Sequence, residues 1–278
     1  GAMVENKALQ AALWQQLDAL GVELYERTRV EQYQFDARRV TLSNGVELSY
    51  DLLIGADGGN SQVARAAGIG YRGWEYDMRC LLAIAEVEVD VPPATWEVFR
   101  PQGPYALLPL GGQRVCLIDY RAESTWQELL AQPTDTLYDM LQTLFEPHIG
   151  AHRVLSHGSF PLRRQRALHY HRNQSVVLIG DAAHSIHPLA GQGVNLGFAD
   201  VQELVEQIAR LSLAEALVAY ERRRVGANQQ MMRAMDMIHV GFCSKHFLPR
   251  GAIALGLTGV QRIAPLKRAL LLRAIGYC

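Results

Sequence analysis

The sequence lacks the features that define several specialised classes of protein. Its four cysteines lie far apart in 278 residues and form neither a Cys-x-x-Cys pair nor another metal-ligand spacing, so no structural zinc site is expected. No apolar stretch reaches the roughly 20 residues of a membrane-spanning helix. Neither an internal repeat nor a low-complexity segment is present. We therefore expect a globular protein whose cysteines, Cys80, Cys116, Cys243 and Cys278, are reduced thiols.

Net charge is also scarce, at −1, but it is distributed unevenly. The segment from Arg210 to the C-terminus carries eleven Lys and Arg residues against three Asp and Glu residues. Its basic side chains include Arg222-Arg223-Arg224, and those from Arg262 to Arg273 are interleaved with apolar residues. This arrangement could lie on an anionic membrane surface. Alternatively, this segment is a pair of packed helices with solvated basic side chains. No recognised nucleic-acid-binding motif accompanies the charge, so a nucleic-acid partner is not expected.

Hydrophobic periodicity divides the chain into four regions, and its length is enough for two lobes. Residues 1–70 and 161–211 carry strand-turn-helix patterns, residues 71–160 are rich in strands, and residues 212–278 are helical. The predicted helices are Val4–Leu20, Thr125–Ala131, Thr134–Phe145 and Val194–Leu211. A small antiparallel set of strands is predicted within Val22–Leu48, which turns at Ser43-Asn44-Gly45. Further strands are predicted within the motif Asp51–Ser61 and at Cys80–Val89, Thr95–Arg100, Tyr105–Leu110, Arg114–Tyr120, Val154–Phe160 and Val176–Ile179.

The most specific pattern runs from Gly180 to Gly197, directly after the apolar run Ser175–Ile179. The run predicts a short buried strand that ends at Gly180-Asp181, and a glycine-punctuated loop then leads into a helix. A strand that delivers an aspartate and then a helix N-terminus places an acceptor for sugar hydroxyls beside free backbone N–H donors. This arrangement suits a nucleotide cofactor, although glycine-rich strand-to-helix turns also occur without a ligand.

A second strand-turn-helix pattern lies at Asp51–Ser61, where the apolar residues end in Ala56-Asp57-Gly58. Asp57 has two roles open to it, and they are compatible. It can take part in nucleotide binding, or it can cap the following helix by accepting hydrogen bonds from the first free N–H groups.

Together the two patterns resemble the flavin-binding motifs of the p-hydroxybenzoate hydroxylase-like flavoprotein aromatic monooxygenases. The resemblance implies that Asp57 and Gly58 lie near the FAD pyrophosphate and are linked to the use of NADH or NADPH. It also implies that Asp181 bonds the ribityl chain of FAD and that the following loop passes along the isoalloxazine ring. The implied cofactor-binding residues are Asp57, Gly58, Gly180, Asp181, Pro188, Gly191, Gln192, Gly193, Val194 and Asn195.

The same resemblance implies the fold class. We expect an α+β or α/β, FAD/NAD(P)-binding hydroxylase-like fold that lacks its N-terminal GxGxxG unit. Residues 1–70 and 161–211 would be two parts of the FAD-binding domain, and residues 71–160 would be an inserted mixed-sheet substrate lobe. Residues 212–278 would form a C-terminal helical region.

Two departures from the family pattern qualify this expectation. The family opens with a GxGxxG unit, whereas this chain has no GxGxxG and opens with Gly1-Ala2-Met3, which resembles a cloning remnant. We therefore expect a truncated chain that binds FAD poorly and is inactive by itself. The family also places an Arg seven residues after Asp57, where this sequence has Ala64. Arg65 follows one step later, about 100° further around a helix, and this departure concerns nicotinamide handling more than FAD binding.

Phrases along nearly the whole chain, among them Val4-Glu5-Asn6, Asn60-Ser61-Gln62-Val63 and Met235-Asp236, resemble the bacterial ubiquinone-biosynthesis hydroxylases. The match is best with the branch that hydroxylates 3-demethoxyubiquinol. The resemblance implies hydroxylation of a polyprenyl benzoquinol ring by O₂ through a flavin C4a-hydroperoxide, with NADH or NADPH as the reductant. The implied substrate-lining residues are Tyr105, Leu107, Pro109 and Cys116.

Three residues of the second motif are candidates for catalysis under this resemblance. A backbone group at Pro188 would face the flavin ring. His184 or His187 could help to deprotonate the quinol hydroxyl, because a phenolate attacks better than a phenol. For both histidines the alternative is a packed ring that bonds the backbone. No metal site is expected.

Other functions and the location of the protein remain open. The chain could belong to a flavin hydroxylase of another aromatic substrate or another ring position, or to a non-catalytic subunit of a biosynthetic assembly. We expect a cytoplasmic protein that can lie at the inner face of the bacterial plasma membrane. Its expected partners are a prenylated quinol, O₂ and other ubiquinone-biosynthesis proteins.

Overall fold

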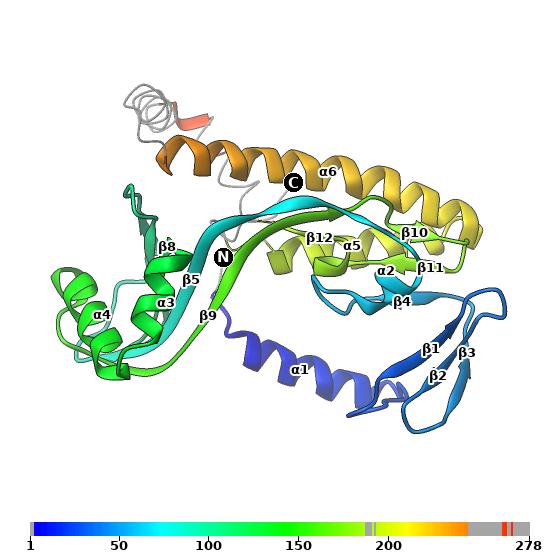
Figure 1. Cartoon of the computed structure of the whole chain (residues 1–278), viewed down its shortest axis with the longest axis horizontal. Coiled ribbons are helices and arrows are strands. Elements are labelled where there is room, and N and C mark those ends of the chain that lie inside the picture. Colours follow the sequence, from blue (N-terminus) through cyan, green and yellow to red (C-terminus); the bar gives the residue numbers. More distant parts are fainter. Residues whose placement is uncertain (1–2, 187–190, 192, 244–262, 266–267, 269–278) are drawn as a thin grey trace. The chain divides into compact units, whose positions relative to one another are not determined.

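The computed structural model describes residues 3–186, 191, 193–243, 263–265 and 268 (Figure 1). The chain forms two compact units. One, the sheet unit, is built around Glu75–Leu162 and includes the chain up to Glu23; the other, the motif unit, consists of Leu24–Trp74 and Arg163–His239. The divisions after Trp74 and Leu162 lie close to the predicted ones after residues 70 and 160. The chain before Leu24 groups with the sheet unit, whereas the prediction placed it with the rest of residues 1–70.

The sheet unit contains most of a six-stranded sheet, in the order β12-β9-β5-β8-β7-β6. Strands β5 and β9 are the long ribbons of Figure 1 and continue into the motif unit, to which β12 belongs. Antiparallel pairing joins β5 to β8, β8 to β7, and β7 to β6. The strands are β5 (Tyr71–Val87), β6 (Trp96–Val98), β7 (Tyr105–Gly111), β8 (Arg114–Ala122), β9 (His152–Ala167) and β12 (His184–Ser185).

One face of this sheet is covered by helices α3 (Glu123–Leu130) and α4 (Thr134–Ile149). Successive residues of a strand point to opposite faces, so alternate residues of β5, β7 and β8 bury their side chains against the helices. Helix α4 extends beyond its predicted end because its buried side chains continue at a spacing of four residues. They are Leu137, Leu141, Phe145 and Ile149.

The motif unit has two small sheets. The first is the predicted antiparallel set, in the order β1-β2-β3, with β1 at Val30–Gln34, β2 at Arg39–Leu42 and β3 at Glu47–Ser49. Between β2 and β3 the chain turns at the predicted place, where Gly45 has a φ of +83°. The second sheet has the order β10-β11-β4, with β4 at Leu53–Gly55, β10 at His171–Arg172 and β11 at Val176–Leu178.

Three helices and a short 3₁₀ turn complete the described part of the motif unit. They are α2 (Gln62–Ala66), η1 (Gly180–Ala182), α5 (Gly193–Ile208) and α6 (Leu213–Cys243), of which the residues up to His239 group with this unit. The three residues of β11 are wholly buried, as the predicted strand requires, and they pack with side chains of α2, α5 and α6 in one core. The core therefore supports both strand-turn-helix patterns.

Helix α5 turns its polar side inward. Its buried residues are Asp200, Leu204 and Gln207, whereas its apolar residues at helical spacing are exposed. An amphipathic helix usually buries its apolar stripe, so α5 reverses the common arrangement. The exposed residues are Val194, Phe198, Val201, Val205 and Ile208.

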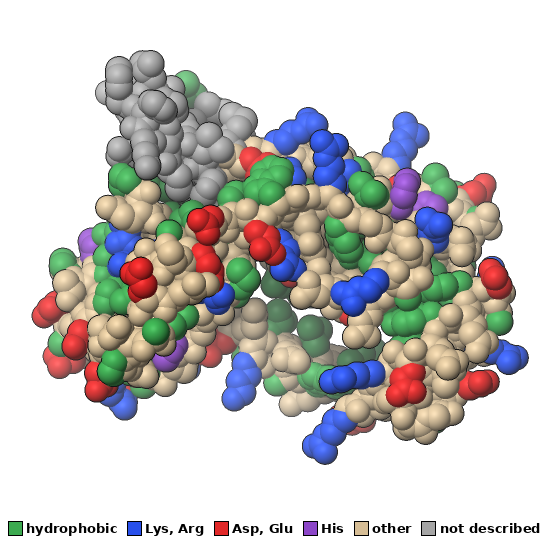
Figure 2. Space-filling model, in the orientation of Figure 1, with side chains coloured by type: hydrophobic (Ala, Val, Ile, Leu, Met, Phe, Trp, Pro, Cys, Tyr) green, Lys and Arg blue, Asp and Glu red, His purple; other side chains and the backbone are tan. Residues whose placement is uncertain are grey.

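Helix α1 (Asn6–Ala19) confirms the predicted first helix but buries none of its side chains. Within the ranges that the structure describes, none of the helices combines the length and the apolar character of a membrane-spanning segment. Basic side chains protrude over α6 in Figure 2. Arg222 and Arg223 of this helix are exposed. The third residue of this run is an exception, because Arg224 is only 9% exposed. The alternative in which the basic side chains are solvated is therefore wrong for Arg224, and residues 244–262, 266–267 and 269–278 of the predicted basic tail lie outside the described residues.

Candidate functional site

The two sequence motifs begin at the same sheet edge. Strands β4 and β11 lie side by side and parallel, with Leu53 opposite Val176 and Gly55 opposite Leu178. Neighbouring parallel strands end at a common edge. The turns that carry Asp57 and Asp181 therefore leave the sheet next to each other, as the resemblance to a nucleotide-binding fold requires.

Asp57 caps helix α2. Its Oδ2 accepts hydrogen bonds from the backbone N–H groups of Gln62, at 2.6 Å, and Val63, at 3.1 Å. The Ser61 hydroxyl accepts a third bond, from the N–H of Ala64, at 2.9 Å. These contacts confirm the capping role, and they leave the predicted role of Asp57 and Gly58 at the cofactor as a prediction.

The helix position where the family carries an arginine faces the core. Ala64 is 0% exposed and belongs to the hydrophobic core of the motif unit, so an arginine side chain at this position would need a different packing. Arg65, one residue later, is exposed. The one-residue shift thus points the basic side chain away from the place that the family pattern gives it.

Residues of β9 bond the first motif turn, and a residue of β5 bonds the second. The Arg163 guanidinium donates to the Asn60 side chain at 2.7 Å, and the Gln165 amide donates to the carbonyl oxygen of Gly59. On the other turn, the Tyr71 hydroxyl donates to the Ala182 carbonyl oxygen at 2.7 Å.

The two turns also approach each other directly. A Cβ atom at Gly59 would lie 3.2 Å from the Ser185 hydroxyl. The residues after Asp57 and after Asp181 therefore line one small region. A large ligand bound at one turn would meet the other.

The second motif forms a tight turn between β11 and α5. Gly180 has a φ of +58°, in the left-handed region that a residue without a Cβ adopts most easily. A Cβ at Gly197, in the second turn of α5, would lie 3.5 Å from the Gly180 Cα. The two glycines therefore allow the helix to begin close against the turn.

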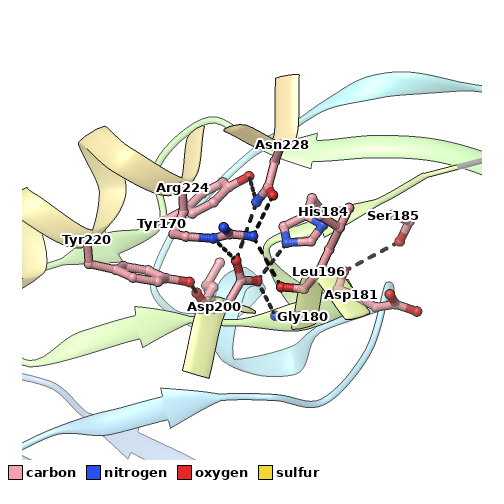
Figure 3. Close-up of polar contacts among 11 residues, drawn as sticks. Tyr170, Gly180, Asp181, His184, Ser185, Leu196, Asp200, Tyr220, Arg224 and Asn228 are labelled. Carbon is pink, nitrogen blue, oxygen red and sulfur yellow. Dashed lines mark hydrogen bonds and ion pairs between the residues drawn. The ribbon is translucent and has the colours of Figure 1, made fainter. Parts of the chain in front are cut away.

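Asp181 presents a carboxylate at this turn. Its side chain is exposed, and in Figure 3 it points away from the buried polar residues around it. Within the described part of the chain no hydrogen bond is made to this carboxylate. Partial burial raises its pKa above the ordinary value, and the nearby His184 lowers it to a smaller extent. An accessible acceptor of this kind suits the hydroxyl groups of a ribityl chain.

Behind the turn lies a buried polar cluster, drawn in Figure 3. Its centre is Asp200 of α5, which is 0% exposed. Asp200 Oδ2 accepts hydrogen bonds from the Gly180 N–H, at 2.9 Å, and from His184 Nε2, at 2.6 Å; Oδ1 accepts from Arg224 Nε at 2.6 Å. Arg224 also donates to Asn228 Oδ1, at 2.9 Å. One carboxylate thus binds the turn, a histidine and an arginine of α6.

The charges of this cluster balance one another. Burial alone would raise the pKa of Asp200, but the hydrogen bonds and charges of His184 and Arg224 outweigh it and lower the pKa. Asp200 is therefore ionised, and it compensates the buried guanidinium. Sequence reasoning missed Asp200, Arg224 and Asn228. The available signal was a charged residue on the same helical face as Leu204.

His184, a predicted catalytic candidate, is 1% exposed. Its Nε2 donates a hydrogen bond to the ionised Asp200 carboxylate. Its Nδ1 is buried and has no partner among the residues that the structure describes. The ring lies 6.0 Å from that of Tyr170. His184 thus packs as in the alternative interpretation, but it bonds a carboxylate instead of the backbone, and its role as a base stays a prediction.

The remaining residues of the implied cofactor site are only partly described. His187, Pro188 and Gln192 lie outside the described residues. Gly191 is exposed with a φ of +60°. The others, Gly193, Val194 and Asn195, form the first turn of α5, where Val194 and Asn195 are exposed. The N–H groups of this turn are those that a helix leaves free at its start.

The predicted substrate-lining residues lie on two faces of the sheet unit. Leu107 is 0% exposed and packs in the core under α3 and α4, and Tyr105 packs against the same core. Pro109, two residues after Leu107 in β7, is on the same face of the strand as Tyr105 and Leu107. Cys116, opposite Leu108, is on the other face. The four residues therefore do not line one surface, and their contact with a substrate stays a prediction.

Known proteins resemble this chain over nearly its full length. The family described as FAD binding domain matches residues 2–235. The 3-demethoxyubiquinol 3-hydroxylase of Escherichia coli (strain K12) is 37% identical over 99% of this chain and 73% of its own length. The ubiquinone hydroxylase UbiL of Rhodospirillum rubrum is 36% identical over 99% of this chain and 67% of its own length.

Solved structures share the fold. The anhydrotetracycline hydroxylase OxyS from Streptomyces rimosus matches with a TM-score of 0.75 and 24% sequence identity. The match covers 98% of this chain, which spans 56% of the OxyS chain. At this identity the likeness is one of fold.

Proposed function

Because the chain belongs to the FAD binding domain family of FAD-dependent monooxygenases, we propose that it serves to hydroxylate the ring of a polyprenyl benzoquinol in ubiquinone biosynthesis. The family and the hydroxylase-like fold are those that the sequence predicted. The proposed substrate is inferred from the names of the two relatives at 37% and 36% identity, both of which are ubiquinone hydroxylases. O₂ and NADH or NADPH would be the co-substrates.

The observation that carries this proposal is the common edge of β4 and β11, from which the turns of Asp57 and Asp181 both leave. FAD, when bound, supplies the redox chemistry that activates oxygen. The exposed carboxylate of Asp181 can accept hydrogen bonds from hydroxyl groups of the ribityl chain. The free N–H groups at the start of α5 can stabilise negative charge on a bound group, since a helix N-terminus carries partial positive charge. The residues present therefore fit a flavin nucleotide.

The substitution Asp181→Ala tests this assignment. We expect FAD to bind the variant roughly ten- to a hundred-fold more weakly, because hydrogen bonds to a charged group contribute about 1.5–3 kcal/mol each. The measurement is a titration of flavin fluorescence at increasing protein concentration. Asp51→Ala, at an exposed aspartate beside β4, is the control and should bind as the unsubstituted chain does. Equal affinity of the Asp181 variant and this control would remove Asp181 from the cofactor site.

Activity is a separate question from binding. The chain spans 73%, 67% and 56% of the relatives compared above, and we propose that it binds FAD weakly and does not turn over by itself. Consumption of NADH or NADPH that increases on addition of a quinol would contradict this. We also propose a location at the inner face of the plasma membrane, because the polyprenyl tail of the substrate partitions into lipid.

A further inference from the structure

The buried carboxylate of Asp200 has a role beyond the packing of α5. We propose that Asp200 is a positioning residue, which holds the turn Gly180–His184 in the shape that presents Asp181 to the cofactor. This inference rests on the proposed FAD-binding function, and it concerns a residue that does not itself reach the ligand.

The first support is the place at which Asp200 holds the turn. It accepts a hydrogen bond from the N–H of Gly180, the residue directly before Asp181, and another from the side chain of His184, three residues after it. The turn is thus held on both sides of Asp181. Meanwhile the Asp181 carboxylate points away from the cluster (Figure 3). Fixing the backbone on both sides restricts where this carboxylate can lie.

The second support is that the same carboxylate fixes the start of α5. Arg224, paired with Asp200 Oδ1, also donates to the carbonyl oxygen of Leu196 at 3.2 Å. Leu196 belongs to the first turn of α5. The two features that the proposed function assigns to the cofactor, the Asp181 carboxylate and the helix N-terminus, are therefore linked through one buried charge.

The third support is the orientation of α5 about its own axis. The helix exposes its apolar residues, among them Val201 and Val205, and buries Asp200. Burial of an ionised group is costly unless it is paired and hydrogen-bonded, and Asp200 is paired with Arg224 and bonded to the Gly180 N–H and to His184. The observed rotation is the one that brings the carboxylate to the turn.

The test compares three single substitutions in this chain. Asp200→Asn keeps the shape of the side chain but removes its charge and one acceptor oxygen. Glu203→Gln, on the same helix, removes a carboxylate that bonds Gln207 and Arg223 and does not touch the turn. Tyr220→Phe removes a buried hydrogen bond to the Leu178 carbonyl oxygen and serves as a control for general loss of stability.

Two measurements are made on each variant: hydrogen–deuterium exchange of the backbone amides and titration with FAD. We expect at least ten-fold faster exchange of the amides in Gly180–Ile186 in the Asp200 variant, and an at least ten-fold weaker affinity for FAD. The Tyr220 variant is compared at the same loss of melting temperature. It should not speed amide exchange in Gly180–Ile186 more than in the rest of the motif unit, and it should not weaken the affinity for FAD ten-fold. The Glu203 variant should resemble the unsubstituted chain.

Failure of this inference is distinguishable from failure of the proposed function. If the unsubstituted chain binds no FAD at any concentration, the proposed function fails for this chain, while the exchange measurement still decides whether Asp200 holds the turn. Exchange in the Asp200 variant that is no faster than in the Tyr220 variant would overturn the inference whatever the FAD titration gives. If Asp200→Asn does not fold, His184→Leu replaces it, because it removes one of the two bonds to the turn and leaves the Asp200–Arg224 pair intact.

Discussion

Two exposed aspartates of the motif unit use their carboxylates in different ways. Asp57 bonds the backbone N–H groups of Gln62 and Val63 at the start of α2. Asp181, at the end of the neighbouring strand, makes no hydrogen bond through its carboxylate to any residue that the structure describes. We therefore expect substitution of Asp57 to change stability and substitution of Asp181 to change ligand binding.

For Asp57 the expected loss is that of a helix cap. Asp57→Ala should lower the free energy of unfolding by about 1 kcal/mol. Urea unfolding followed by circular dichroism measures this, with Asp57→Asn as the control because its side chain keeps an acceptor oxygen. Equal stability of the alanine variant and the original chain would mean that the Ser61 hydroxyl alone, which bonds the Ala64 N–H, is enough to cap α2.

At the residue scale, the sequence predicted what local patterns determine. The turns at Asp57 and Asp181 follow from a strand that ends in glycine and aspartate, and both were found there. Asp200 and Arg224 were not predicted, because their importance depends on α5 and α6 meeting behind a turn that lies earlier in the chain. Arg224 instead stood in the sequence as one of three consecutive arginines, a pattern typical of a solvated surface.

Helix α5 shows the limit of sequence patterns at the scale of an element. Its periodic apolar residues predicted a helix, and a helix formed over Gly193–Ile208. The same residues are exposed, Val205 by 60%. Periodicity gives the angle between side chains but not which side meets the core, and here the buried side is the one that carries Asp200, Leu204 and Gln207.

Helix α6 offers a test of intrinsic helix stability. Gly226 is an exposed residue inside this helix, with no atom within 4 Å of the place that a Cβ would occupy. Gly226→Ala should raise the free energy of unfolding by about 1 kcal/mol, because glycine is the poorer helix former by that amount. Chemical denaturation measures the change.

The reverse substitution at the next position, Ala227→Gly, provides the control. Ala227 is also exposed in α6, so this change should lower stability by a similar amount. If both substitutions changed stability in the same direction, a local contact and not helix propensity would determine the result.

At the scale of the whole molecule, one buried acid makes stability depend on pH. Burial raises the pKa of Glu97 in β6 from 4.5 to about 7. A group that binds its proton more tightly in the folded state destabilises the fold as pH rises. The stability that protonated Glu97 contributes is therefore fully present below pH 4.5 and is lost as pH rises through about 7.

Glu97→Gln should therefore have a pH-dependent effect. We expect the variant to melt higher than the original chain at pH 8 and to show no such gain at pH 4.5, the ordinary pKa of a glutamate. Differential scanning calorimetry at several pH values measures the difference. Glu88→Gln, at an exposed position, is the charge-matched control. A gain of equal size at all pH values would show that ionisation of Glu97 is not its cause.

The division of the molecule into two units was predictable in part. The change from strand-turn-helix patterns to a run of strands placed the divisions near those after Trp74 and Leu162. The grouping of the first helix was not predictable, because α1 buries none of its side chains and its pattern carries no information about a partner. The faces of β7 were not predictable either, since alternation leaves open which side α3 and α4 cover.

The arrangement of the motif unit has a consequence for the order in which the chain folds. The Tyr71 hydroxyl bonds the carbonyl oxygen of Ala182, a residue 111 positions later, and β4 pairs with β11 over a similar separation. During synthesis, β4 is therefore made long before its partner, and strands β5 to β10 all emerge before β11 does. Until β11 arrives, the edge of β4 that pairs with it in the folded sheet stays open to pairing with a wrong strand. A nascent chain interrupted inside the intervening sheet is, for this reason, the form most exposed to misassembly.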